Sequence, residues 1–315
     1  MSIHPFLRAL CCSLLGLLAA PAIACTYAET GGNLGSVPSF RVRNGPAITT
    51  SGNFSLSCSG VVLAALTGQP SVSATLASPA TGLTLKNGTN SIPYQITQSN
   101  GTALTTGFVF INASGTTVVG LFSGNSSANV PINITTNVGA NVPAGTYTDT
   151  IQVTWALRNI CEGLLVVAGL CVGTPTNTDT TRSLLVTLTV TNDCVITAPN
   201  IAFGSAPLPS AFPTVSQDIG LLCTAGLSYT VGLSAGGHAS AGQRRMASGT
   251  NFLAYDIFKA SGALWGEVGG ARAPGPAVAD GLNLQTIPYN ATVYPAQAPP
   301  PAGSYTDNVV VDVQF

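Results

Sequence analysis

The residues that could do chemistry in this chain are its cysteines, one histidine and a few acids. Six cysteines follow the first 24 residues: Cys25, Cys58, Cys161, Cys171, Cys194 and Cys223. An even number of cysteines in an exported chain predicts disulfide bonds rather than reactive thiols. His238 stands near Ser240 in a Gly- and Ser-rich stretch, but a serine nucleophile needs a positioned base. We interpret His238 as a solvated loop residue.

The acidic residues do not make a stronger case for catalysis. Glu162 is a lone acid between two cysteines, whereas Asp149 and Asp307 recur at matching places where strands begin, which favours a structural role. No group of His, Cys, Asp and Glu has metal-ligand spacing. The Gly-rich stretch 266–275 lacks the phosphate-loop pattern. We expect no enzyme, no metal and no cofactor.

The N-terminus predicts export from the cytoplasm. Arg8 precedes an apolar run over 10–20, and small residues at Ala22 and Ala24 form a cleavage site before Cys25. These features predict a signal peptide over residues 1–24, too short to span a membrane. A lipid-modified Cys25 is a less favoured alternative.

The composition indicates a folded chain with a nearly neutral surface. Hydrophobic residues make up 45% and charged residues 7%, and the formal net charge is −1. The chain has no basic patch, so nucleic acid is not an expected partner. A surface of Thr, Ser, Asn and Gly suits close packing against copies or partners.

An internal duplication sets the expected domains. Gly88-Thr89-Asn90 recurs as Gly249-Thr250-Asn251, and the block 143–149 recurs as 301–307 at a similar displacement. Repeats in the same order predict two diverged copies of one domain. We assign residues 25–193 to the first copy and residues 194–315 to the second.

The repeat also predicts the disulfide pairs. Cys25 and Cys194 open the two copies, and Cys58 and Cys223 follow at similar separations, so we pair Cys25 with Cys58 and Cys194 with Cys223. Cys161 and Cys171 have no counterpart in the second copy and should pair with each other.

Alternating apolar residues predict strands throughout, as over 150–155, 184–190 and 309–315. No segment has a convincing helical period with caps. The expected fold is all-β, with two antiparallel immunoglobulin-like sandwiches.

The first copy has a further strand at 182–191 that the second copy lacks. The second sandwich should therefore have an open edge that invites a strand from another chain; a shorter but complete fold is the alternative.

These residues resemble the spore coat U domain family. The resemblance rests on Cys194, Phe203-Gly204, Cys223, the Gly-Thr-Asn…Tyr block and the terminal 301–307 strand, and it is looser over 25–193, where Leu34-Gly35 stands for Phe203-Gly204. Proteins of this kind resemble subunits of archaic chaperone–usher pili. The implied partners are a periplasmic chaperone, an outer-membrane usher and a neighbouring pilin that donates a strand.

A two-domain member resembles the tip adhesin of such a pilus. The second copy should accept a donor strand, and a chain that starts at Cys25 has no extension with which to donate one. The resemblance implies export through the periplasm to the cell surface at the pilus tip. It also implies attachment to apolar abiotic or host surfaces and support of biofilm formation.

Apolar loops of the first copy are the candidate adhesive residues. The loop between Cys161 and Cys171 is favoured as an exposed finger, and for the stretch 117–122 exposure and core are equally expected. A third stretch, 61–66, is favoured as core. The candidate adhesive residues are Leu164, Leu165, Val166, Val167, Leu170, Val118, Val119, Leu121 and Phe122.

Two other functions stay open. A structural coat or pilus-shaft subunit would have the same fold without an adhesive role. A secreted glycan-binding protein would have a specific sugar ligand, which nothing in the sequence requires.

Overall fold

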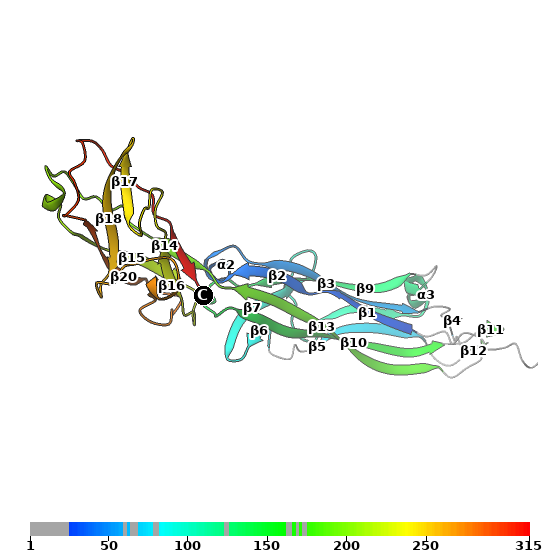
Figure 1. The fold of residues 1–315 in the computed structure, drawn as a ribbon. Helices are drawn as coiled ribbons and strands as arrows, with labels where there is room; N and C mark the ends of the chain where they lie inside the picture. Colours follow the sequence, from blue (N-terminus) through cyan, green and yellow to red (C-terminus); the bar gives the residue numbers. More distant parts are fainter. Residues whose placement is uncertain are drawn as a thin grey trace, which may run out of the picture.

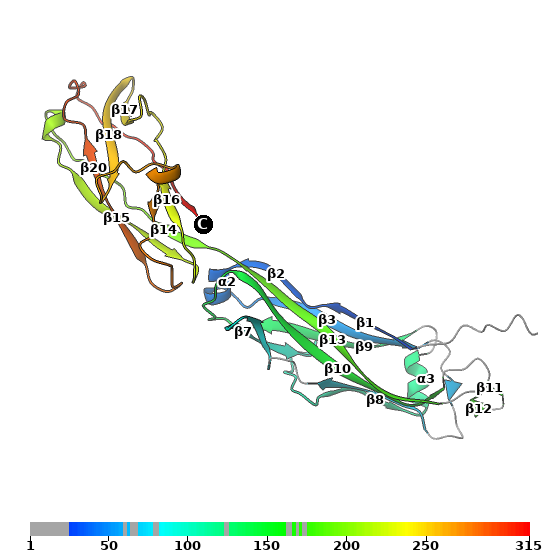
Figure 2. The ribbon, with the colours of Figure 1, turned by 60° about the horizontal axis from the view of Figure 1, so that its bottom comes forward.

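The computed structural model describes residues 25–315 except 59–61, 64–68, 78–81, 123–125, 162–165, 168–169 and 172–174. The described chain is mostly strand, and its two copies lie end to end (Figures 1 and 2). The predicted all-β class with two immunoglobulin-like sandwiches is confirmed. No helix in the described ranges is long and apolar enough to cross a membrane.

The first copy is built from two packed layers. One layer has the order β1-β3-β9-β7, made of β1 (Cys25–Gly31), β3 (Thr49–Cys58), β9 (Ser127–Thr136) and β7 (Asn90–Thr97). Every neighbouring pair in this layer is antiparallel.

The second layer is centred on the long strand β10 (Gly145–Cys161). On one side β10 pairs with β13 (Thr176–Thr191), and β13 pairs in parallel with β2 (Asn33–Pro38). The other partners of this layer are β4 (Val62–Leu63), β5 (Ser71–Ala77), β6 (Thr84–Asn87) and β8 (Val109–Ser114).

The chain crosses between the layers at Gly31 and Gly32. Their φ angles are +89° and +84°, which side chains other than glycine rarely adopt. A Cβ on Gly31 would also collide with the Ser51 carbonyl oxygen, and one on Gly32 with that of Leu185. This crossing lets β1 belong to one layer and β2 to the other.

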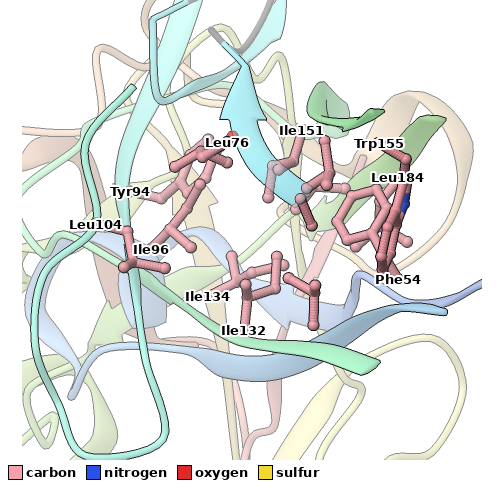
Figure 3. Close-up of a cluster of buried hydrophobic side chains, with 14 of the residues drawn as sticks. Phe54, Leu76, Tyr94, Ile96, Leu104, Ile132, Ile134, Ile151, Trp155 and Leu184 are labelled. Carbon is pink, nitrogen blue, oxygen red and sulfur yellow. The ribbon is translucent and has the colours of Figure 1, made fainter. Parts of the chain in front are cut away.

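The layers enclose a continuous apolar core. Alternation along the strands places one side chain in two on the inner face, as in β9, where Val130, Ile132 and Ile134 are all buried. Figure 3 shows Phe54, Trp155 and Leu184 meeting in this core beside the Ile132–Ile134 row.

Two short helices differ from the sequence-based expectation of strands and loops only. They are α2 (Ser39–Asn44), which follows β2, and α3 (Thr116–Phe122), which follows β8. Both are about two turns or less, too short to show a clear helical period.

The second copy repeats this plan with fewer strands. One layer is β14-β15-β20-β18-β17, made of β14 (Cys194–Thr197), β15 (Val215–Cys223), β20 (Gln285–Val293), β18 (Asn251–Lys259) and β17 (Arg244–Ser248). The other is β19-β16-β21, made of β19 (Ala273–Pro274), β16 (Thr230–Leu233) and β21 (Val311–Gln314). Two helical turns, η2 (Pro209–Ala211) and η3 (Gly269–Ala271), lie in its loops.

The disulfide predictions are confirmed for two pairs. Cys25 is bonded to Cys58 and Cys194 to Cys223, and each bond joins directly opposed residues of an antiparallel strand pair, β1–β3 in the first copy and β14–β15 in the second. The backbones of Cys161 and Cys171 belong to β10 and β12, and the predicted bond between them lies outside the described part of the structure.

Candidate functional site

Strand β13 completes the first copy. It lies between β10 and β2, so that it pairs with a strand on each side. Leu184, Val186, Leu188 and Val190 alternate along it and are all buried. Burying such side chains stabilises a fold by about 1.5–3 kcal/mol each, so β13 is a main contributor to this core.

The second copy has a counterpart of β2, but it is not a strand. The segment 202–207 reads Ala-Phe-Gly-Ser-Ala-Pro, against Asn-Leu-Gly-Ser-Val-Pro in β2. Gly35 and Gly204 have nearly the same positive φ, +84° and +80°. The segment keeps the backbone bend of β2 but pairs with no strand, because in the described second copy nothing takes the place of β13.

The counterpart of β10 has no strand partner among the described residues on the side that β13 would occupy, while on its other side Thr306 forms a bridge with Ala247. The repeat aligns Gly145, Tyr147, Asp149 and Ile151 with residues 303, 305, 307 and 309. In the first copy these β10 residues pair with Val190, Leu188, Val186 and Leu184 of β13. In the second copy β21 pairs with β16 on one side only.

An open groove lies between these two segments. It runs between residues 198–203 and 305–311 and has a volume of about 330 Å³. We call it the acceptor groove. Its apolar lining comes from both layers and includes Ile201, Phe203, Ile219, Leu233, Met246, Ile257, Tyr289, Val309 and Val311.

A repeated Tyr–Asp hydrogen bond ties the layers together. Tyr94 donates to Asp149 Oδ2 at 2.9 Å, and Tyr255 donates to Asp307 Oδ2 at 2.8 Å. Burial and then the neighbouring carboxylate raise the pKa of Tyr94, and burial followed by the bond to Asp307 raises the pKa of Tyr255. Both tyrosines therefore stay neutral donors.

The two Tyr–Asp pairs differ in their surroundings. Asp149 is buried opposite Val186 of β13, whereas Asp307 borders the acceptor groove. Asp307 also accepts hydrogen bonds from the backbone amides of Gly237 and Asn308. Asp149 and Asp307 thus recur because each one accepts the tyrosine hydrogen bond that joins the two layers of its copy, and a catalytic role is not needed to explain them.

The predicted adhesive residues fall into two regions. Val166 and Val167 form β11 (Val166–Val167), which pairs with β12 (Leu170–Cys171) in a small hairpin. Figures 1 and 2 place this hairpin at the end of the first copy away from the second copy. Leu164 and Leu165 lie outside the described residues.

The other predicted adhesive residues belong to α3. Val118 and Phe122 are buried, and Leu121 is half-buried against the core. Of the two equal expectations for this stretch, the structure places these three in or against the core. The side chain of Val119 lies outside the described part, as do those of 61–66, although Val62 and Leu63 form β4 beside the end of β10.

Sequence reasoning found the open edge but not the residues that line it. The lining comes from seven separated stretches of chain, and only their folding brings them together. The tyrosines had a readable signal, since Tyr94 and Tyr255 sit in one repeated block and their acids in another.

Comparison with protein families identifies the two copies. The model of the Spore Coat Protein U domain matches residues 12–154 and again residues 180–312. Together these matches cover most of the chain and follow its internal duplication. A comparison with curated protein sequences finds no match.

Comparison with solved structures finds similarity to proteins of bacterial pili. The chain resembles one chain in the structure of the CsuC–CsuE chaperone–tip adhesion subunit pre-assembly complex, from archaic chaperone–usher Csu pili of Acinetobacter baumannii. The identity is 26% over 93% of this chain and 100% of that chain, with a TM-score of 0.57. The CupB6 tip adhesin of Pseudomonas aeruginosa matches at 13% identity over 93% of this chain and 95% of that one, with a TM-score of 0.38, too low to support an inference.

Proposed function

Because the chain belongs to the spore coat protein U domain family, we propose that it is an adhesin subunit of an archaic chaperone–usher pilus. Its second copy accepts a β-strand from a neighbouring pilin, and its first copy meets the surface to which the cell attaches. The subunit works by assembly and contact, and we assign it no catalytic step.

The acceptor groove is the observation that carries this proposal. An apolar slot with unpaired strand-forming segments on both sides is a site for strand addition. The first copy supplies the template, because β13 fills the equivalent slot with four alternating buried side chains. A donor strand in the groove would run antiparallel to 303–309 and parallel to 202–207, as β13 runs beside β10 and β2.

The similarity to a chain from a chaperone–adhesin complex supports a pilus chaperone as an assembly partner. A groove that exposes core residues needs protection before the donor arrives, and a periplasmic chaperone would supply it. An outer-membrane usher would then exchange the chaperone for the donor strand of the next pilin. The mature subunit would be extracellular and attached to the pilus.

The shape of the molecule supports a tip position. The hairpin of β11 and β12 lies at one extreme and the second copy at the other (Figure 1). The first copy has its strand β13 already in place, which leaves its far end free to meet an apolar abiotic or host surface. Contact at that end would begin attachment and biofilm formation.

Neighbouring valines give a sharp test of the acceptor groove. Val309 lines the groove, whereas Val310 is 65% exposed. Val309→Arg should prevent incorporation into surface fibres, because the donor strand would have to bury a charge. Val310→Arg is the matched control. Immunoblots of sheared fibres measure incorporation, and equal incorporation of both variants would count against the proposal.

A further inference from the structure

The joint between the two copies has the form of a link between two subunits. Strand β13, which completes the first copy, ends at Thr191, and β14 of the second copy begins at Cys194. The second copy is therefore preceded by a strand that fills the slot of the copy before it. On the proposed function, the next pilin would be joined to the second copy in the same way.

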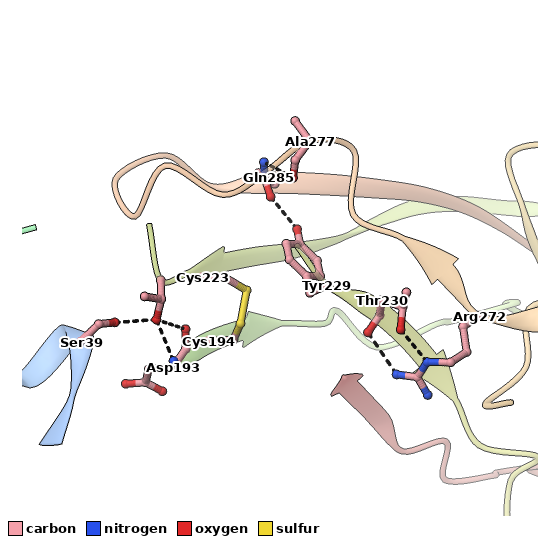
Figure 4. Close-up of a disulfide and its surroundings, with 10 residues drawn as sticks. Ser39, Asp193, Cys194, Cys223, Tyr229, Thr230, Arg272, Ala277 and Gln285 are labelled. Atoms are coloured by element: carbon pink, nitrogen blue, oxygen red, sulfur yellow. Dashed lines mark hydrogen bonds between the residues drawn. A yellow bond between two sulfur atoms is a disulfide. The ribbon is translucent and has the colours of Figure 1, made fainter. Parts of the chain in front are cut away.

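Contacts at this joint reach beyond the strand. Ser39 in α2 and Thr224 in the second copy form a buried hydroxyl pair with their oxygens 2.6 Å apart. Thr224 Oγ1 also accepts a hydrogen bond from the amide of Asp193 at 2.7 Å. Figure 4 shows hydrogen bonds from Ser39 and Asp193 converging on the same hydroxyl beside the Cys194–Cys223 disulfide. The loop after the second cysteine of one copy thus docks on the copy before it.

A second contact lies on the other side of the joint. Asn141 donates to the carbonyl oxygen of Asp280 at 2.8 Å, and Pro143 lies 3.8 Å from the position that a Cβ on Gly226 would take. On the first copy, the surface of this joint is therefore made by Ser39, Asn141 and Pro143.

The repeat maps that surface onto an open pocket of the second copy. Ser39 follows the Gly-Ser-Val-Pro of β2 as Leu208 follows Gly-Ser-Ala-Pro, and Asn141 and Pro143 align with Pro299 and Pro301. These three counterparts all line one pocket of about 260 Å³ beside the end of the acceptor groove. We call it the end pocket.

The end pocket is open where its counterpart is covered. Ser39 is 5% exposed, because the second copy covers it, whereas Leu208 is 52% exposed. The turn η2, which follows Leu208, lies at the end of the second copy away from the first (Figures 1 and 2). The pocket is thus placed where the next subunit of a linear fibre would begin.

We propose that the end pocket is the docking surface for the cysteine-bearing end of the next spore coat U domain, whose loop after its second cysteine seats against Leu208 as Thr224 seats against Ser39. The pocket is rich in proline and has no charged side chain among its lining residues. The natural partner is accordingly a pilin domain with an apolar residue at the position of Thr224. This inference rests on the proposed function and adds a second contact to the donor strand.

A tandem chain tests the docking with the protein's own second copy as the probe. Residues 176–315 are appended after Phe315 through a Gly-Ser linker, so that the appended 176–191 can fill the acceptor groove as β13 fills the first. Leu208→Cys is combined with Thr224→Cys in the appended copy. Loss of both free thiols on mild oxidation is the expected result. The positive control is the unextended chain with Ser39→Cys and Thr224→Cys, whose oxygens are already in contact. In the negative control, Val268→Cys, at another exposed position, replaces Leu208→Cys in the tandem chain.

Hydrogen exchange of residues 305–311 shows separately whether the appended strand is seated. A seated strand without the Leu208 cross-link would overturn the docking inference and leave the proposed function standing. An unseated strand would overturn the proposed function and the inference with it. If Leu208→Cys does not fold, Pro299→Cys with Asp280→Cys in the appended copy probes the same surface, as the counterpart of the Asn141–Asp280 contact.

Discussion

At the scale of single residues, the repeated tyrosine–aspartate bond connects the sandwich layers. Tyr94 is held over a buried carboxylate, while its counterpart Tyr255 is bonded to an acid at the rim of the acceptor groove. The Tyr–Asp pair of the first copy therefore lies in a closed core, whereas the pair of the second copy lies at the open acceptor groove. Replacing either tyrosine with phenylalanine removes the hydroxyl and its hydrogen bond but keeps the ring. Such a variant therefore measures the contribution of the bond to the free energy of unfolding.

Tyr94→Phe should lower the free energy of unfolding of the full chain by about 1–3 kcal/mol, because Asp149 would lose its buried partner. Tyr255→Phe should cost less, since Asp307 keeps the amides of Gly237 and Asn308 and lies at an open groove, whereas the buried Asp149 keeps the amide of Thr150. Urea unfolding followed by tryptophan fluorescence measures both. A larger loss for Tyr255→Phe would contradict the assignment.

The raised tyrosine pKa values also predict a pH dependence. A tyrosine whose folded pKa is above its ordinary value of 10 favours the folded state while it is protonated. That contribution is fully present below pH 10 and is lost as the pH rises further. Stability measured between pH 8 and about 11 should therefore fall above pH 10, and less steeply in Tyr94→Phe. An equally steep fall in the variant would show that other groups cause it.

At the scale of elements, the strand β13 decides which copy is closed. Its pattern of apolar residues over 184–190 was readable in the sequence, and so were the two confirmed disulfides, because both depend on local alternation and repetition. The helix α3 could not be predicted in this way, because seven residues that include Gly120 are too few to show a helical repeat of apolar residues. The Ser39–Thr224 contact joins residues 185 positions apart, and no local pattern predicts such a pair.

Two leucines of β13 test its contribution. Leu188→Ala should lower the free energy of unfolding by about 2–5 kcal/mol, because it empties a fully buried site. Leu185→Ala, at an exposed position of the same strand, should change it by no more than about 0.5 kcal/mol. Chemical denaturation of the two variants provides the comparison, and similar values would show that β13 does not hold the first core together.

At the scale of the whole molecule, the two ends of the chain differ in structure, and the proposed function gives each end its own task. The β11–β12 hairpin ends the first copy, the acceptor groove and end pocket open the second, and the joint between the copies repeats the link proposed between subunits. A tip subunit needs this polarity, because one end must meet a surface while the other is held by the fibre.

Replacing Leu165, Val166 and Val167 with Asp should abolish attachment to plastic while surface fibres stay at the parental level. Charged side chains at this end would lose the gain from burying apolar surface. Val138→Asp, at an exposed position elsewhere on the first copy, is the control. Attachment is measured by crystal violet staining, and unchanged attachment of the triple variant would contradict an adhesive role of the hairpin.

Strand acceptance by the second copy is the central claim, and one measurement tests it most directly. A synthetic peptide with the sequence of Ser183–Thr191 is added to the full chain, and hydrogen exchange is followed at residues 305–311. We expect the amides of residues 305, 307 and 309 to become protected, since the peptide would pair with them as β13 pairs with Tyr147, Asp149 and Ile151 of β10. The amide of Thr306 is already bonded to Ala247 and should change little. A peptide carrying Val186→Asp and Leu188→Asp should give no protection. Unchanged exchange with the unaltered peptide at saturating concentration would contradict the account.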